Sequence, residues 1–251
     1  MPGTREQAEN HGYLHEALAV TLQVRDGNLC VLLWQRGMSP HAGRWALPGG
    51  SLLPHERLGT SLARHLAEKV EVKTVTHLEQ LETRSDPNRD PRGRILATAY
   101  LGLVPTDVEP EVPDDTAWHP VASLPPTAFD HGSIVGSGIA RLRAKLSYTN
   151  IGFALAPPTF TMAQLRDVYA AALGQPLSAT NLQRVLTRRA VIMPLNTTAP
   201  PGPGGGRPAA LYRFNIRTLH VTDPAAVFRT PGRRRDLGTS SDQPTSLARR
   251  S

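Results

Sequence analysis

The stretch from Gly49 to Val72 constrains the fold of this chain more than any other part of the sequence. A Gly-Gly pair follows Pro48, and apolar residues then recur four apart, at Leu58, Leu62, Leu66 and Val70. That spacing predicts a single buried stripe along an amphipathic helix. The polar face of this helix is expected to carry Arg64, His65, Glu68 and Lys69, with Glu56 just ahead of it.

Strand patterns surround this predicted helix on both sides. Alternating apolar residues over 16–24, an Asp26-Gly27 turn and the apolar run 29–34 predict a β-hairpin. We expect further strands over 74–83 and 93–104, a short strand-like segment over 118–124 and a helix over 134–146. Strands mixed with two helices predict an α/β/α sandwich for the first half of the chain.

The second half has a different pattern. Thr161 and Gln164 predict a capping box, with Phe160 and Leu165 as a hydrophobic staple, and Gly174 is expected to end that helix. Ser178 is expected to cap a basic helix that runs to about residue 190. Two short strands, 191–195 and 209–214, would then flank a loop rich in proline and glycine. A helix, a short turn, a basic helix and a β-hairpin are typical of a winged helix-turn-helix.

The net charge of +7 is unevenly distributed. Residues 150–214 hold six arginines against one aspartate, residues 215–251 hold seven against three, and the first 149 residues are slightly acidic. Two domains with different partners are therefore expected, and the basic one points to nucleic acid, with a solvated charged face as the alternative. We predict four segments: a disordered N-terminus (1–14), an α/β domain (15–149), a winged helix-turn-helix (150–216) and a basic, disordered tail (217–251).

The cysteine content and the hydropathy of the sequence indicate in which cellular compartment the protein is expected. The one cysteine, Cys30, lies in an apolar run, so the chain can form no internal disulfide framework, which fits a reducing cytoplasm. No apolar run approaches the ~18 residues of a transmembrane helix, and the N-terminus lacks a secretory core. We therefore expect a cytoplasmic protein with no membrane partner.

The opening stretch resembles a Nudix box, and six residues fall on its pattern: Gly50, Glu56, Arg64, Leu66, Glu68 and Val72. His65, Lys69 and Glu71 depart from it. Nudix enzymes hydrolyse diphosphates with a divalent metal held by the glutamates of this helix, and Glu68 alone keeps such a position. Lys69 would repel a metal and His65 is a poor Mg²⁺ ligand. We therefore expect hydrolysis to be lost or very weak and a role for Mg²⁺ to be doubtful.

Some of these residues admit a second interpretation. Glu68 could be a residual metal ligand or a surface charge, and Glu56 and Arg64 could serve only to anchor a loop.

Two further motifs narrow the resemblance. The segment 89–94, followed by Ala99-Tyr100, resembles Nudix proteins that recognise ADP-ribose. The segments 124–131 and 206–214 are similar to Nudix-related transcriptional regulators of the NrtR type, and the likeness covers about residues 14–216. It implies a homodimeric repressor of NAD metabolism genes that binds a palindromic operator in double-stranded DNA. It also implies ADP-ribose or a related metabolite as effector, with no required cofactor.

Candidate residues follow for both partners. For the effector, anion-binding side chains and backbone amides are expected among Arg44, Gly49, Gly50, Arg89, Arg92, Arg94, Asp130 and His131, although the last two could instead cap a helix. For DNA, groove and phosphate contacts are expected from Thr180, Asn181, Gln183, Arg184, Thr187, Arg188 and Arg207. The alternatives to a repressor are an active ADP-ribose pyrophosphatase, which could also bind DNA, and a scaffold that binds protein.

Overall fold

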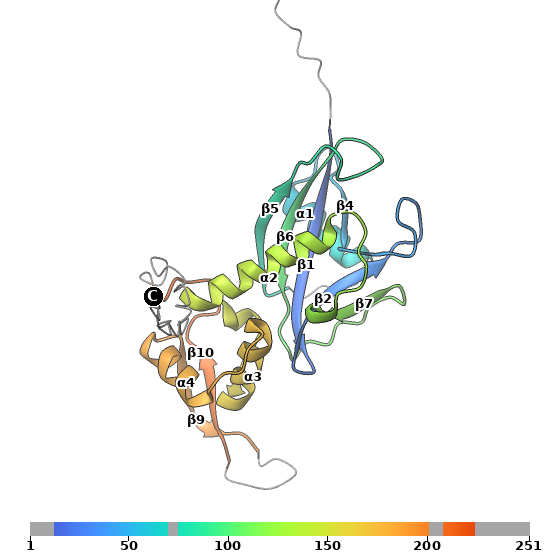
Figure 1. The fold of residues 1–251 in the computed structure, drawn as a ribbon. Helices are drawn as coiled ribbons and strands as arrows, with labels where there is room; N and C mark the ends of the chain where they lie inside the picture. Colours follow the sequence, from blue (N-terminus) through green and yellow to red (C-terminus); the bar gives the residue numbers. More distant parts are fainter. Residues whose placement is uncertain (1–12, 70–74, 201–207, 224–251) are drawn as a thin grey trace, which may run out of the picture.

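The structure is a computed structural model of the 251-residue chain, and it describes residues 13–69, 75–200 and 208–223. Figure 1 shows a first domain built on one large sheet and a second domain of short helices and strands. The first domain contains β1 (Leu14–Arg25), β2 (Asn28–Gln35), β3 (Trp45–Ala46), β4 (Gly49–Ser51), α1 (Leu58–Lys69), β5 (His77–Arg84), β6 (Ile95–Leu103), β7 (Thr116–Pro120), η1 (Val121–Ser123) and α2 (His131–Tyr148).

Strand β1 is the centre of the large sheet. The strand order is β3-β2-β1-β6-β5, with β4 paired to β1 and β7 paired to β2. The β1–β6 pair is parallel and the other pairs are antiparallel. Gly49 lies at φ 154°, and a Cβ there would collide with the Ala17 carbonyl oxygen, so glycine is what lets β4 approach β1.

Each side of β1 packs toward a different helix, because successive side chains in a strand point to opposite sides of the sheet. Ala17 and Ala19 pack in a cluster with Leu62 and Leu66 of α1. Leu18, Val20 and Leu22 belong to the larger core beneath α2, with Ile134 and Leu142 among its members. The predicted α/β/α sandwich is therefore confirmed.

The orientation of α1 differs from the prediction in one respect. Ser61 and His65 are buried beside Leu62 and Leu66, whereas Ala63 and Ala67 are exposed. His65 was placed on the polar face and is instead 6% exposed. The buried stripe is rotated toward β4, because α1 also packs against that short strand, and the His65 Nε2 atom lies 3.3 Å from the Ser51 carbonyl oxygen.

The segment predicted to be strand-like over 118–124 is only partly a strand. Strand β7 ends at Pro120 and a 3-10 turn occupies Val121–Ser123. Proline has no N–H to donate to a neighbouring strand, so β7 ends where the sequence has Pro120.

The second domain contains η2 (Ile151–Ala154), β8 (Phe160–Thr161), α3 (Met162–Leu173), α4 (Ala179–Arg188), β9 (Ile192–Thr198) and β10 (Ala210–Phe214). The predicted capping box is present: Gln164 N donates to Thr161 Oγ1, and Thr161 N donates to Gln164 Oε1. Gly174 ends α3 in the left-handed conformation and Ser178 caps α4. The strands form a sheet in the order β8-β10-β9, and the predicted winged helix-turn-helix is confirmed.

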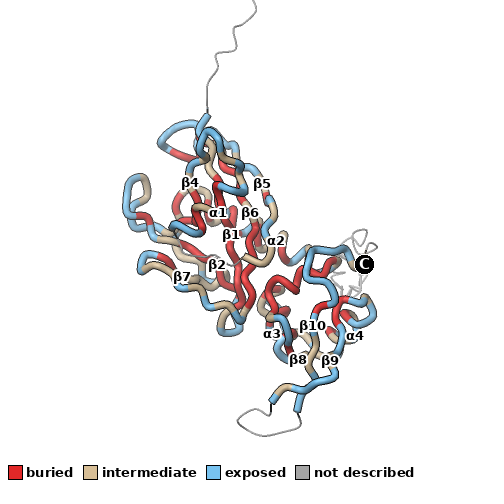
Figure 2. The backbone as a smooth tube through the Cα atoms, turned by 180° about the vertical axis from the view of Figure 1, so that it is seen from behind, coloured by how far each residue is buried: buried red, intermediate tan, exposed pale blue. Residues whose placement is uncertain are grey.

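The two domains share one apolar core. It extends from β1 and α2 through the fully buried residues of η2 to Phe160 and Phe214, whose rings lie 5.3 Å apart. Figure 2 shows buried backbone continuing from the large sheet into α3. None of the helices in the described part of the chain is long and apolar enough to cross a membrane.

Part of the predicted disordered tail is ordered. Residues 215–223 follow β10 and bind the junction between the domains through Asn150, which is 2% exposed. Asn150 Nδ2 donates to the carbonyl oxygens of Ile216 and Thr218, and Asn150 Oδ1 accepts from His220 N. The prediction of disorder is therefore wrong for 217–223, while 1–12 and 224–251 lie outside the described residues. Arg217 Nη2 donates to the Phe153 carbonyl oxygen, and Asp223 pairs with Arg189, so several long-range contacts without sequence periodicity hold this segment.

Candidate functional site

A cavity of about 390 Å³ opens where β4, the middle of α1 and the start of α2 meet. Strands β1 to β4, both helices and the loops between them contribute to it, so the stretch that begins at Gly49 forms part of its wall. The lining residues are Glu16, Leu18, Trp34, Arg36, Met38, Ala46, Leu47, Gly49, Gly50, Ser51, Leu53, Arg64, His65, Arg92, Phe129 and His131.

Glu56 and Arg64 form a two-point ion pair on the loop that enters α1. Arg64 Nε donates to Glu56 Oε1 at 2.9 Å, and Arg64 Nη2 donates to Glu56 Oε2 at 2.7 Å. These hydrogen bonds lower the pKa of Glu56 to about 2. Arg64 Nη2 also lies 3.4 Å from the Ser51 carbonyl oxygen, so the pair connects α1 to β4. This geometry fits the loop-anchoring interpretation.

The remaining box residues provide little for a metal. Glu68 is 60% exposed at its side chain, and its nearest ion-pair partner is Arg64, at 3.5 Å. Lys69 is the last residue of α1, and the structure does not describe its side chain. Glu71 and Val72 lie outside the described residues. Across the described ranges, no group of three or more His, Cys, Asp or Glu side chains is placed to hold a metal ion.

Arg89 lies beside the cavity rather than in it. Its side chain is 1% exposed, and its Nη2 and Nε atoms donate to the two Asp130 carboxylate oxygens at 2.8 and 3.3 Å. Asp130 stands at the N-cap of α2, but its side chain makes no capping hydrogen bond. The pair therefore connects the β5–β6 loop to the start of α2. This ion pair with Arg89 is neither of the two contacts predicted for Asp130, which were with the effector or with the helix end.

Arg92 lines the cavity and is already paired. It contacts Asp90, at 2.6 Å, and Glu16, at 3.0 Å, and its guanidinium lies 5.4 Å from the Phe129 ring centre. Burial opposes ionisation of Asp90, but hydrogen bonds from Arg92 outweigh it and the pKa of Asp90 is lowered. Arg94 stacks against exposed Tyr13, and Arg44 reaches toward the Thr127 carbonyl oxygen. Neither Arg94 nor Arg44 lines this cavity.

His131 begins α2 at the cavity wall. Its Nδ1 atom accepts a hydrogen bond of 2.9 Å from the Leu47 backbone N–H. Burial lowers the pKa of His131 to about 3, so the ring is neutral near pH 7. Its Nε2 atom is buried and has no hydrogen-bond partner in the described part of the chain. The histidine predicted for the effector is therefore in the cavity, although it does not cap the helix through its side chain.

Sequence reasoning missed two central lining residues, Arg36 and Phe129. Arg36 follows the end of β2 and is 9% exposed, and its guanidinium lies 4.9 Å from the Phe129 ring centre. Burial, followed by the charge of Arg92, lowers the pKa of Arg36. A single arginine after a strand is a weak signal. Its significance depends on the long-range approach of Phe129, which has a positive φ of 50°.

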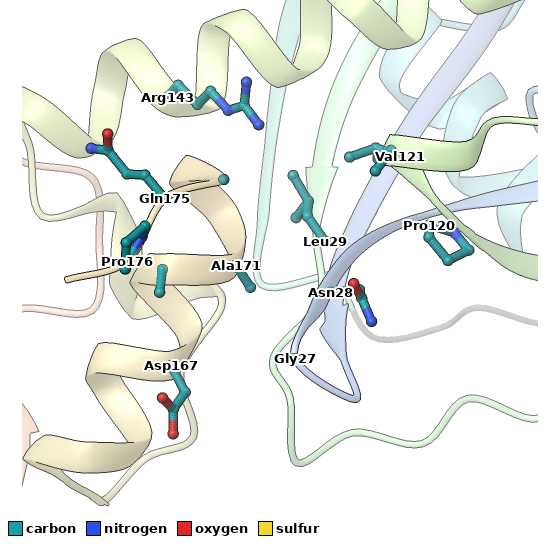
Figure 3. Close-up of a pocket in the computed structure, with 13 residues that line it drawn as sticks. Gly27, Asn28, Leu29, Pro120, Val121, Arg143, Asp167, Ala171, Gln175 and Pro176 are labelled. Atoms are coloured by element: carbon teal, nitrogen blue, oxygen red, sulfur yellow. The ribbon is translucent and has the colours of Figure 1, made fainter.

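A second cavity, of about 440 Å³, lies between the domains. Figure 3 shows the β1–β2 hairpin tip on one side, around Asn28, and the end of α3 with Gln175 on the other. Its charged residues already have partners: Arg143 Nε donates to the Ala172 carbonyl oxygen, and Asp167 pairs with Arg166. This cavity therefore offers no buried group that needs a ligand as clearly as His131 does.

Helix α4 presents a polar face to solvent. The predicted DNA contacts that are exposed are Thr180, Asn181, Arg184, Thr187 and Arg188. Leu182 and Leu186 are buried on the opposite side, against the core. Arg184 Nη2 donates to Asn181 Oδ1 at 2.7 Å, so these two side chains lie together on the exposed face.

Gln183 differs from the other candidates on α4. It is half-buried and donates a hydrogen bond of 2.8 Å to the Tyr212 hydroxyl of β10. It therefore connects α4 to the wing strands. Arg207, predicted at the wing tip, lies outside the described residues.

Family comparisons match both halves of the chain. Residues 14–135 match the family described as the NUDIX domain, and residues 152–214 match the NrtR DNA-binding winged helix domain. An ADPR responsive transcriptional repressor, NtrR, of Acinetobacter baylyi is 31% identical over 208 residues, which cover 80% of this chain and 82% of that protein.

Two further relatives represent the two functions considered above. An ADP-ribose pyrophosphatase of Methanocaldococcus jannaschii is 32% identical over 130 residues, covering 49% of this chain and 73% of that enzyme. NrtR of Shewanella oneidensis is 32% identical in one crystal structure (TM-score 0.69) and 31% identical in another, complexed with a 27mer DNA (TM-score 0.67). Both cover 80% of this chain, and 94% and 93% of the Shewanella chains.

Proposed function

The chain belongs to the NrtR family of Nudix-related regulators, and we propose that it is a DNA-binding transcriptional repressor that responds to ADP-ribose or a related NAD-derived metabolite. The observation that carries this proposal is the pairing of two sites in one chain. A winged helix-turn-helix exposes a row of hydrogen-bonding side chains on α4, and a cavity with arginines lies beside the Nudix helix.

Helix α4 is suited to the major groove of DNA. Arginine can contact guanine with two hydrogen bonds, and asparagine can do so with adenine. Asn181 lies in the first turn, where recognition helices usually meet base edges, and Arg184 and Arg188 follow at helical spacing. Thr180 and Thr187 complete the exposed face, and Arg207 is proposed as a phosphate or minor-groove contact of the wing.

The Nudix domain is proposed to bind its ligand without hydrolysing it efficiently. Two of the three motif glutamates are replaced by His65 and Lys69, and the remaining one, Glu68, pairs with Arg64. Mg²⁺ at a diphosphate is held by protein carboxylates together with phosphate oxygens and water, and the motif leaves Glu68 alone to supply such a carboxylate. The ligand is therefore proposed to act as an effector, with no required metal.

A gel-shift assay on the intergenic DNA upstream of the protein's own gene tests the repressor. We expect a specific, salt-dependent shift that ADP-ribose changes, because phosphate contacts release counterions and the two sites share one core. A protein that gives no specific shift on this DNA would overturn the proposal and favour a protein-binding scaffold.

The second candidate function is an ADP-ribose pyrophosphatase, which the Methanocaldococcus relative favours. Incubation with ADP-ribose and Mg²⁺, followed by AMP detection, separates the two: rapid turnover would contradict the loss of catalysis. We further propose a cytoplasmic homodimer on a palindromic operator that controls NAD metabolism genes, since two-fold operators require two-fold proteins.

A further inference from the structure

Among the arginines around the effector cavity, Arg36 differs in its charge environment. Arg64, Arg89 and Arg92 each bind a carboxylate, namely Glu56, Asp130 and Asp90, within 2.8 Å. Arg36 has no carboxylate partner among the residues that the structure describes. Its Nε donates to the Pro40 carbonyl oxygen at 2.9 Å, and that oxygen carries no formal charge.

The cavity therefore contains a buried arginine that no carboxylate of the described residues contacts directly. Burying an ionised group without a counter-charge is costly, and proteins usually avoid it unless the charge has a partner or a ligand. The aromatic face of Phe129, 4.9 Å away, compensates only in part. The nearby carboxylates Glu16 and Asp90 act on Arg36 only through their charge, because both make their direct contacts with Arg92.

His131 supplies a second donor in the same cavity. Because its Nδ1 atom accepts the Leu47 N–H, the neutral ring must carry its proton on Nε2. That Nε2–H is buried and has no partner in the described part of the chain. A donor held in this way requires an acceptor that the protein does not supply.

We propose that Arg36, assisted by the Nε2–H of His131, binds the anionic phosphate oxygens of the effector. This inference rests on the proposed function and names the residues that receive the diphosphate of ADP-ribose. Arg89 and Arg92 then have a different role: their carboxylate pairs hold the loops around the cavity. A charge-assisted bond between guanidinium and phosphate would give Arg36 the direct anionic contact that it lacks among the described residues.

Calorimetric titration with ADP-ribose tests the inference on the full chain. R36M keeps a long apolar side chain but removes the charge, and it is expected to weaken binding about 10- to 100-fold. R57M is the matched control: Arg57 is exposed and lies outside the cavity lining, so binding should not change. The Tm of ligand-free R36M is expected to change little, because the substitution breaks no direct ion pair of the described residues.

H131N is the second variant and isolates the other donor. The asparagine carbonyl oxygen can replace Nδ1 as acceptor for Leu47 N–H, but the asparagine does not reach the Nε2 position. Binding is expected to weaken about tenfold, the cost of one buried hydrogen bond to a charged group. Inorganic pyrophosphate, titrated into the same variants, should show the same order if the contact is to phosphate.

The outcomes are distinct. If R36M binds ADP-ribose as tightly as the unaltered protein, the inference is overturned while the proposed function stands. A lower Tm with unchanged affinity would assign Arg36 to structure. If the unaltered protein binds neither ADP-ribose nor pyrophosphate, both the inference and the effector part of the proposed function fail.

Discussion

The arginines of the effector domain and those of α4 share a side chain but differ in surroundings. Arg64, Arg89 and Arg92 each contact a carboxylate at 2.6–2.8 Å. On α4, Arg184 contacts only the Asn181 amide oxygen, and Arg188 has no partner among the described residues. An arginine that is paired with a carboxylate of the chain holds a loop in position. An arginine without such a partner remains available to phosphates and bases.

Arg189 shows that an arginine with a carboxylate partner can lie directly beside one without such a partner. It follows Arg188 directly, but its Nη2 binds Asp223 at 2.6 Å and its Nη1 donates to the Ser147 carbonyl oxygen in the last turn of α2. The C-terminal end of a helix attracts cations, so this contact suits α2 as well. Arg189 therefore belongs with the structural arginines, although it lies in the basic half of the chain.

The largest expected effect comes from breaking a neutralised pair. R89M removes a side chain that is 1% exposed and leaves the Asp130 carboxylate without its two hydrogen bonds. Removing one partner of a buried pair typically costs about 3–5 kcal/mol of unfolding free energy. Urea denaturation would measure the loss, with the exposed R94M expected within about 0.5 kcal/mol of the unaltered protein. A change below about 1 kcal/mol in R89M would contradict a structural role for this arginine.

The converse test removes an arginine that has no carboxylate partner among the described residues. R188A is expected to weaken operator binding by about 1–3 kcal/mol without lowering Tm, because Arg188 contributes to DNA contact rather than to folding. R189A should show the opposite pattern, with lower stability from the loss of Asp223 and Ser147 as partners. R166A, an exposed paired arginine on α3, is the control for general loss of charge. Equal effects of R188A and R189A on both readouts would remove the distinction.

A third test uses the buried histidine of the effector domain. The pKa of His131 falls from 6.5 to about 3 on folding, so the unfolded chain binds the extra proton first as pH is lowered. Its contribution to stability is present above pH 6.5 and is lost as pH falls toward 3. Between pH 6.5 and 5, H131N is expected to reduce the loss of unfolding free energy by about 1–2 kcal/mol. Identical slopes for the two proteins in denaturant titrations would refute this assignment.

Local patterns predicted much of the architecture. The four-residue spacing at Leu62 and Leu66, the capping box at Thr161 and the left-handed Gly174 each depend on neighbours within a few residues. Such features are encoded by helical periodicity and by backbone capping, so they can be recognised without knowing the rest of the fold.

The candidate site was harder to predict because it depends on contacts between distant residues. Arg92 lines the cavity and Arg89 lies beside it, and the carboxylates that they contact include Asp130, 41 residues from Arg89, and Glu16, 76 residues from Arg92. Arg36 was missed for the same reason. The charge that a side chain retains depends on its partners, and sequence spacing does not reveal them.

The smallest expected effect concerns the candidate on α4 that already has a partner. Gln183 donates to the Tyr212 hydroxyl, so it is expected to position the wing rather than to read a base. Y212F removes that acceptor and should cost about 0.5–1.5 kcal/mol of stability. Q183A and Y212F should then weaken binding to the operator and to its single-base variants by the same factor. A loss of discrimination at one base pair in Q183A alone would show instead that Gln183 leaves Tyr212 to contact DNA, and would move it to the group with Arg184.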